Sequence, residues 1–185
     1  MSNRTFLSQF FKQKRMVGAL APSSKFLAAK MLNHLPIEKA SIIVELGPGT
    51  GVFTNKIIKR MAPNAHLIVI ELNDIFFENI SKNFTQPNVH LHHGSAEKIG
   101  DFIHSLGAKH ADIIVSSLPF TVFPSEVRDA ILNKIHEFLN PEGYFVQFQY
   151  SLHSKKALNQ IFIKTKINFT PLNFPPAFIY TCSKV

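Results

Sequence analysis

The sequence of 185 residues predicts one α/β domain built on a doubly wound sheet. The first observation is the stretch SIIVELGPGTG at residues 41–51, where an apolar strand runs into a glycine-rich turn and then a helix. The second is another apolar run, residues 66–72, with an acid, Glu71, near its end. The third is the alternation of strand-like and helix-like segments along the remaining chain, without repeats or low-complexity linkers.

Residues 2–16 precede this unit and have the pattern of a short amphipathic helix. Its apolar stripe contains Phe6, Leu7, Phe10 and Phe11, and basic residues occupy other faces. A basic helix with several phenylalanines is typical of an interfacial membrane anchor. The alternative is that the same stripe packs on the body of the protein.

A second helix is expected before the first strand. Ser23 or Ser24 follows Pro22 and is a suitable N-cap, and Pro36 ends the helical pattern. The N–H groups of a capped helix start favour an anion, so this serine pair is a candidate contact for a ligand carboxylate. The alternative is capping alone.

The glycine-rich turn has an acid at the strand end, Glu45, followed by Gly47, Gly49 and Gly51. Glycines at these positions let the backbone adopt positive φ and approach a ligand closely. A dinucleotide fingerprint is G-x-G-x-x-G, whereas this pattern is E-x-G-x-G-x-G before a helix that opens at about residue 51. It resembles motif I of the class I S-adenosylmethionine (SAM) methyltransferases. The resemblance implies a SAM site.

Residues at the ends of the second and third predicted strands also suit a SAM site. Glu71, followed by Leu72, is placed where an acid can accept both hydroxyls of a ribose. A helix over residues 74–84 and a strand over NVHLHH lead to the turn Gly94–Ser95–Ala96, where this fold class contacts the adenine amino group. Many relatives have Asp at the position of Ser95. The three histidines of NVHLHH have no nearby Cys or second acid, so no metal site is expected.

The rest of the chain continues the alternation. Helices are expected over residues 96–106, 125–139 and 153–163, and strands over 111–120, 144–151, 164–169 and 177–183, with NPEG as the turn before the strand at 144. Ligands meet at the carboxyl ends of strands in such a sheet, so four residues should face the transferred methyl group. They are Ser116, Ser117, Leu118 and Pro119.

Charge is distributed unevenly along the chain. The net charge is +8, yet residues 1–37 hold six Lys or Arg and no acid, and residues 143–185 hold five and no acid. Two basic ends around an acidic middle predict a polyanionic partner, either an anionic membrane or a nucleic acid. The single cysteine, Cys182, excludes an internal disulfide and suits a reducing cytoplasm. The N-terminus lacks a signal-peptide pattern, and no stretch is apolar enough to span a bilayer.

The motifs together are similar to those of the bacterial phospholipid N-methyltransferases. They are GALAPSS, VELGPGTGVFT, IELND, SSLPF, FVQFQYS and NFPPAFIY, which extend from about Arg15 to Tyr180. This resemblance implies a Rossmann-like class I methyltransferase sheet with an antiparallel last strand in residues 17–185, preceded by a membrane-associating helix in residues 1–16. It also implies stepwise methylation of phosphatidylethanolamine to phosphatidylcholine by a monomer on the inner face of the cytoplasmic membrane. An ornithine lipid remains an alternative acceptor.

The competing interpretation is an rRNA adenine N6-methyltransferase. Those enzymes carry N-L-P-Y where this chain has Ser117-Leu118-Pro119-Phe120. A serine lacks the amide that holds an adenine amine, so lipid is favoured over nucleic acid. A non-catalytic SAM-binding or membrane-binding protein is a third interpretation, but nothing in motif I is degraded.

The predicted chemistry needs a neutral amine aligned with the methyl donor. Ser117, Tyr150 and Tyr180 are the candidate catalytic residues, because their oxygens can accept hydrogen bonds from the amine and aromatic rings can face methylated cations. Core packing is the alternative for both tyrosines. The lipid phosphate would meet cations, with Arg15, Lys25, Lys155 and Lys156 as candidates. Phe6, Phe10, Phe11 and Phe120 would lie beside the lipid.

Overall fold

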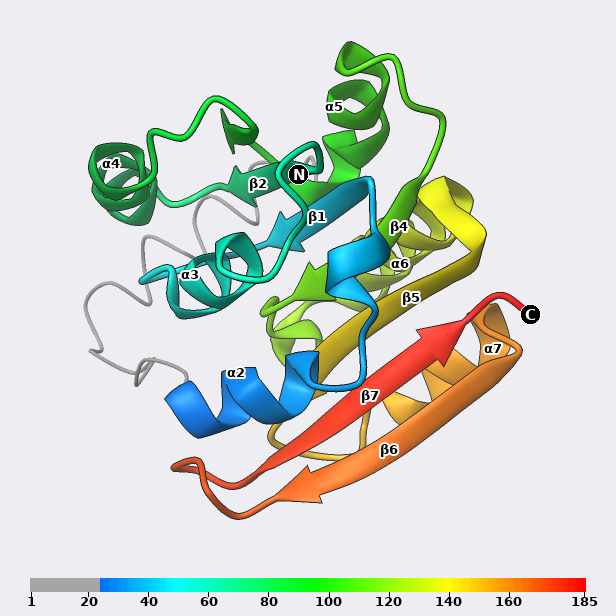
Figure 1. Ribbon diagram of the computed structural model, residues 1–185. Coiled ribbons are helices and arrows are strands. Elements are labelled where there is room, and N and C mark those ends of the chain that lie inside the picture. Colours follow the sequence, from blue (N-terminus) through cyan, green and yellow to red (C-terminus); the bar gives the residue numbers. More distant parts are fainter. Residues whose placement is uncertain (1–23) are drawn as a thin grey trace.

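The computed structural model describes residues 24–185, so the predicted membrane helix in residues 1–16, with Phe6, Phe10, Phe11 and Arg15, and also Ser23, lie outside the described part. The fold prediction is confirmed: a seven-stranded sheet has helices on both faces (Figure 1). Strand order is β3-β2-β1-β4-β5-β7-β6. β1 to β5 pair in parallel, and β7 is antiparallel to both β5 and β6.

All seven predicted strands are present. They are β1 (Ile42–Leu46), β2 (His66–Glu71), β3 (Val89–His93), β4 (Ala111–Ser116), β5 (Leu139–Gln149), β6 (Lys164–Thr170) and β7 (Ala177–Ser183). Every residue of β1 is buried, as expected of a central parallel strand covered on both faces.

The helices form two layers. The α-helices are α2 (Lys25–Leu32), α3 (Val52–Ile58), α4 (Asp74–Asn83), α5 (Ile99–Ser105), α6 (Ser125–Phe138) and α7 (Lys155–Ile161), and short 3-10 turns lie at η1 (Ile37–Lys39), η2 (Ala96–Lys98) and η3 (Phe120–Val122). Side chains of α2, α3 and α4 join one apolar cluster, and those of α5, α6 and α7 join the other. The one helix predicted over residues 96–106 is therefore a 3-10 turn followed by α5.

The start of β5 differs from the prediction. NPEG was expected to be a turn before the strand, but β5 already begins at Leu139 and its register with β4 shifts between Ala111 and Ile113. The Asp112 carboxylate explains the local arrangement, because it accepts hydrogen bonds from the N–H groups of Ser41 (2.8 Å) and Ile42 (3.1 Å) and from the Asn140 amide (3.2 Å). The segment is thus a bulge within a continuous strand.

Within residues 24–185, no helix is both long and apolar enough to cross a bilayer. The same residues contain no group of three or more His, Cys, Asp or Glu arranged to hold a metal ion. Cys182 on β7 is fully buried in the core, and burial raises the pKa of its thiol to about 12.

Candidate active site

The glycine-rich turn has the backbone that the sequence predicts. Gly47, Gly49 and Gly51 all adopt positive φ, at 70°, 56° and 79°. A Cβ added to Gly47 would lie 3.0 Å from the Leu118 side chain, whereas one added to Gly49 would meet no atom within 4 Å. The turn therefore touches the loop after β4 at its first glycine and leaves open space at its second.

Glu71 binds the turn from the end of β2. Its Oε2 accepts a hydrogen bond from the Gly49 N–H (3.3 Å), and its Oε1 accepts from Leu72 and Asn73 (2.8 Å each). Burial raises the pKa of this carboxyl, and the three N–H donors oppose that rise. A mostly buried acid at this strand end is a suitable acceptor for ribose hydroxyls.

Glu45, on β1, is fully buried beneath the same turn. Among the described residues neither of its carboxylate oxygens has a hydrogen-bond partner in good geometry, and neither has the hydroxyl of Thr54. Burial raises the pKa of Glu45 to about 8; Thr54 opposes this rise, and the nearby Glu71 charge adds to it.

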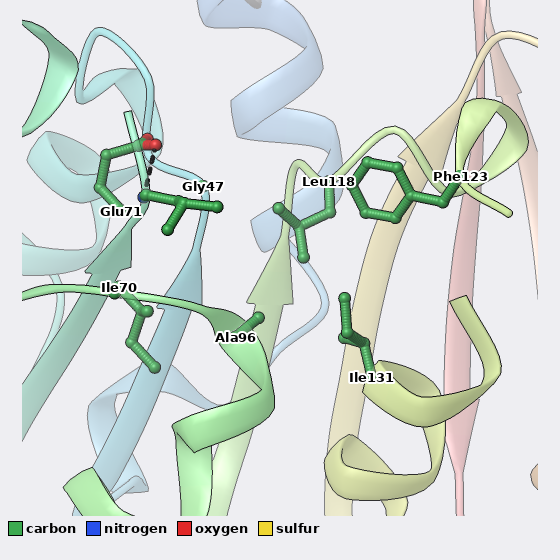
Figure 2. A pocket seen from close by; sticks show the side chains of 9 residues that line it. Gly47, Ile70, Glu71, Ala96, Leu118, Phe123 and Ile131 are labelled. Atoms are coloured by element: carbon green, nitrogen blue, oxygen red, sulfur yellow. Dashed lines mark hydrogen bonds between the residues drawn. The ribbon is translucent and has the colours of Figure 1, made fainter. Parts of the chain in front are cut away.

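A pocket lies at the carboxyl ends of the strands. It is lined by Gly47, Ile70, Glu71, Leu72, Gly94, Ala96, Leu118, Phe123 and Ile131. Figure 2 shows Glu71 and Gly47 across the pocket from Leu118 and Phe123, with Ala96 and Ile131 below them. Five predicted cofactor residues thus meet at one place: Gly47, Glu71, Leu72, Gly94 and Ala96.

Three other predicted contacts already have partners within the protein. Ser24 caps α2: its hydroxyl accepts from Leu27 N–H and donates to the Leu172 carbonyl. Ser95 caps η2 and bonds both the N–H and the carboxylate of Glu97. The Ser116 hydroxyl, fully buried, accepts from Leu118 N–H (3.2 Å). The predicted capping role of Ser24 is confirmed, and ligand contacts of these serines stay predictions.

Ser117, in the loop after β4, differs from these serines because its hydroxyl has no hydrogen-bond partner in the described part of the chain. The Ser117 N–H donates to the Leu46 carbonyl (2.9 Å), which ties the loop to β1. Its hydroxyl is buried and has no partner among residues 24–185. The neighbouring Leu118 carbonyl accepts two hydrogen bonds, from Phe120 N–H and from the Gln149 amide (2.9 Å each). Ser117 thus has a side-chain oxygen without a partner in the described structure, but it is not among the residues that line the pocket, and its contact with an acceptor stays a prediction.

Two glutamines were not singled out from the sequence. Gln147 is fully buried and Gln149 nearly so, and their amides hydrogen-bond each other at 3.2 Å. The Gln147 amide nitrogen has no acceptor in the described part of the chain. Their signal was present, because FVQFQ places two polar residues on one face of an otherwise apolar strand. Phe123 and Ile131 line the pocket, and apolar residues of this kind carry no such signal in the sequence.

The aromatic candidates have separate positions. Tyr150 is 41% exposed at the end of β5, and its hydroxyl interacts with Asn173. Tyr180 is fully buried and its hydroxyl donates to the Ser151 carbonyl (3.0 Å), so the packing alternative fits it better than a catalytic contact. Phe120 is likewise in the core, edge-to-face with Phe123 at 5.9 Å, and not at an open lipid surface. Pro119 is half-buried beside it.

The basic candidates do not line the pocket. Lys25, Lys155 and Lys156 are exposed on the surface, at the starts of α2 and α7. Nothing in the described structure brings these lysines into contact with Glu71 or Ser117. They could therefore bind a lipid phosphate only at the outer surface of the molecule.

The fold and the pocket define a class of enzyme, and the comparisons agree. Residues 43–143 match the model of a family described as a methyltransferase domain. The chain therefore belongs to the class I SAM-dependent methyltransferases, and SAM is its cofactor. A precorrin-6y C5,15-methyltransferase from Geobacter metallireducens has the same fold, with a TM-score of 0.70, 16% identity and coverage of 86% of this chain and 88% of that one.

Two relatives with similar sequences have named substrates. An ornithine lipid N-methyltransferase from Singulisphaera acidiphila is 31% identical over 182 residues, which cover 97% of this chain and 95% of the relative. A probable ribosomal RNA small subunit methyltransferase A from Methanococcus aeolicus is 30% identical over 114 residues, which cover 60% of this chain and 38% of the relative. The lipid enzyme thus matches along nearly its whole length.

Proposed function

We propose that this protein transfers methyl groups from SAM to the head-group amine of a membrane aminolipid. The proposed acceptors are phosphatidylethanolamine and its mono- and dimethyl derivatives, which leads to phosphatidylcholine. The observation that carries the proposal is the 31% identity to an ornithine lipid N-methyltransferase over 97% of this chain, which supports an aminolipid acceptor. Phosphatidylethanolamine is the acceptor that the sequence motifs imply. In this proposal the enzyme is peripheral on the inner face of the cytoplasmic membrane.

The described residues fit bound SAM. Gly47, Gly49 and Glu71 would hold the nucleoside part, and the open space beside Gly49 leaves room for it. SAM supplies an electrophilic methyl group on a sulfonium. The protein's part is then to position the acceptor amine and keep water away, since a displacement of this kind depends mainly on alignment.

Ser117 is the proposed contact for the acceptor amine. Its buried, unpartnered hydroxyl can accept a hydrogen bond from the amine. The Leu118 carbonyl, by contrast, already accepts from Phe120 and Gln149. Tyr150, half-exposed at the neighbouring strand end, is the proposed aromatic face for methylated products.

The first experiment measures transfer of labelled methyl from SAM to three acceptors in parallel. These are vesicles with phosphatidylethanolamine, vesicles with ornithine lipid and an rRNA preparation. We expect label in phosphatidylethanolamine. Label in ornithine lipid alone would keep the enzyme class and change the acceptor, whereas label in RNA alone would overturn the proposal.

The second experiment replaces Ser117 by Ala. Loss of one hydrogen bond to the aligned amine should lower kcat by about tenfold or more, while SAM affinity stays unchanged. Ser105→Ala is the matched control, because Ser105 ends α5 and its hydroxyl only bonds the Phe102 carbonyl. Wild-type turnover in Ser117→Ala would exclude the serine from the acceptor site.

A further inference from the structure

The two acid-free ends of the sequence meet in the structure. Residues 24–37 and 143–185 contain no Asp or Glu. The start of α2 is joined to the loop between β6 and β7, because Ser24 N–H donates to Asn173 Oδ1 (3.0 Å) and Ser24 Oγ donates to the Leu172 carbonyl (2.9 Å). Lys30 Nζ donates to the Phe169 carbonyl at the end of β6 (2.7 Å). Figure 1 shows α2 beside this hairpin end.

The junction exposes large apolar side chains. Phe174 is 88% exposed, Phe26 67% and Leu172 63%, and the exposed Lys25 stands beside Phe26 in the sequence. We call the first turn of α2 together with residues 171–176 the α2–loop surface. Single exposed apolar residues are common, but three of them on two joined segments mark an interaction site.

The loop holds these side chains in place. Residues 171–176 read PLNFPP, and each proline restricts its own φ. The Asn173 amide donates to the Pro175 carbonyl (2.7 Å), while its Oδ1 is bound by Ser24. The exposed leucine and phenylalanine are thus displayed by a braced loop, which lowers the entropy cost of inserting them into a partner.

The surface lies at the same edge of the sheet as the pocket. Gln149 at the end of β5 pairs with Phe178, and Thr170 at the end of β6 pairs with Ala177, so the β6–β7 loop follows the carboxyl end of β5. Gln149 also binds the Leu118 carbonyl in the pocket loop. A flat partner that touches Phe174 therefore faces the edge at which the pocket lies.

We propose that the α2–loop surface docks on an anionic lipid bilayer, with Phe26, Leu172 and Phe174 inserted among the head groups. This inference rests on the proposed lipid substrate. The absence of acids from both joined segments and the presence of Lys25 and Lys30 match a negatively charged surface. Protruding apolar side chains with lysines on the same helix suit an interface of this kind, where the rings reach the acyl boundary and the cations stay at the phosphates.

The test uses the absence of tryptophan from the sequence. Phe174→Trp in the 185-residue chain carries its single indole, and Ile163→Trp is its matched control. Ile163 is 75% exposed just before β6, whose first residue pairs with Ser183, at the opposite edge of the sheet. Each variant is mixed with vesicles of equimolar phosphatidylethanolamine and phosphatidylglycerol, and with vesicles of phosphatidylcholine.

We expect the emission of Phe174→Trp to shift to the blue with the anionic vesicles and to be quenched by brominated lipid, with no such change for Ile163→Trp. Leu172→Ser/Phe174→Ser should lower the fraction that sediments with these vesicles by about tenfold, since it removes two inserting side chains. Vesicle binding that leaves the indole at 174 unaffected would overturn the proposal. So would an indole that is already buried without lipid, because another part of the chain or a second copy would then cover the surface.

Failure of this inference and failure of the proposed function are distinguishable in the same samples. Insertion of the indole without label in any lipid would leave the docking surface intact and remove the proposed reaction. Methylation of detergent-dispersed phosphatidylethanolamine by Leu172→Ser/Phe174→Ser, with unchanged sedimentation on vesicles, would keep the reaction and remove the docking surface.

Discussion

At the scale of single residues, Glu71 has two tasks. Its carboxylate accepts three backbone N–H groups that shape the turn and the start of α4. The same carboxylate is the proposed acceptor for the ribose hydroxyls of SAM. A residue of this kind can be predicted from sequence, because an acid that ends an apolar run has few structural reasons to be there.

Glu71→Ala is expected to weaken SAM binding by at least about tenfold, because charge-assisted hydrogen bonds contribute roughly 1.5–3 kcal/mol. Isothermal titration calorimetry measures the affinity, and a melting curve checks that the variant is folded. Asp74→Ala is the matched control, since Asp74 lies three residues away with its side chain 70% exposed. An unchanged affinity in Glu71→Ala would remove Glu71 from the cofactor site.

Glu45 predicts a pH dependence of stability. Its pKa is about 8 in the folded protein and 4.5 ordinarily, so between these values the folded state holds a proton that the unfolded chain has released. The free energy of unfolding should then fall as pH rises through this window, by up to about 1.4 kcal/mol per pH unit from this group. Glu71, whose pKa burial also raises, contributes with the same sign.

Urea unfolding at several pH values tests this prediction. Glu45→Gln should show a shallower decline than the wild type between about pH 5 and about pH 8. Glu126→Gln, at an exposed position in the first turn of α6, should keep the wild-type slope. Equal slopes in all three proteins would mean that Glu45 is ionised in the folded state.

At the scale of elements, local pattern predicted most of the fold. The apolar runs of β1, β2 and β4 are continuous, and Ser24 is a recognisable helix cap. The bulge at the start of β5 was missed because NPEG has turn composition, and the partner that holds it, Asp112, is 28 residues earlier in the sequence. Contacts between side chains that are far apart in the sequence cannot be predicted from the pattern of a short stretch of residues.

Gly143→Ala tests the bulge. A Cβ there would lie 2.7 Å from the Asp112 carbonyl oxygen and 3.0 Å from that of Asn140. Backbone atoms cannot move aside as a flexible side chain can, so we expect a loss of about 1–3 kcal/mol in the free energy of unfolding. Chemical denaturation measures this loss. Glu142→Ala, at the exposed neighbouring position, should stay near the wild type, and equal stability of both variants would show that the bulge relaxes freely.

At the scale of the whole molecule, the sequence shows that both ends of the chain are basic. It does not show that these two ends lie next to each other in the fold. Two basic ends could have stood far apart. The strand order brings them together, because β7 and β6 continue the sheet beyond β5 and the loop between them meets α2. The pocket was predictable for a related reason: strand ends of a parallel sheet share one edge, so Gly47, Glu71 and Gly94 had to lie near one another.

Binding to anionic vesicles should depend on salt. Raising the NaCl concentration from about 0.1 M to about 1 M shortens the Debye length from about 10 Å to about 3 Å, which weakens the attraction between lysines and head groups. Sedimentation with phosphatidylglycerol-containing vesicles should therefore fall with salt, and the weaker binding to phosphatidylcholine should change little. If binding to both kinds of vesicle did not depend on salt, the basic ends would not contribute to docking.

The buried thiol on β7 has a practical consequence. Cys182 is the only cysteine of the sequence, it is fully buried, and its pKa of about 12 leaves almost no thiolate at neutral pH. Maleimide and spin-label reagents should therefore not react with the native protein. A cysteine introduced at any exposed position could then carry a label alone, so distances and depths can be measured on this enzyme without first removing a native residue.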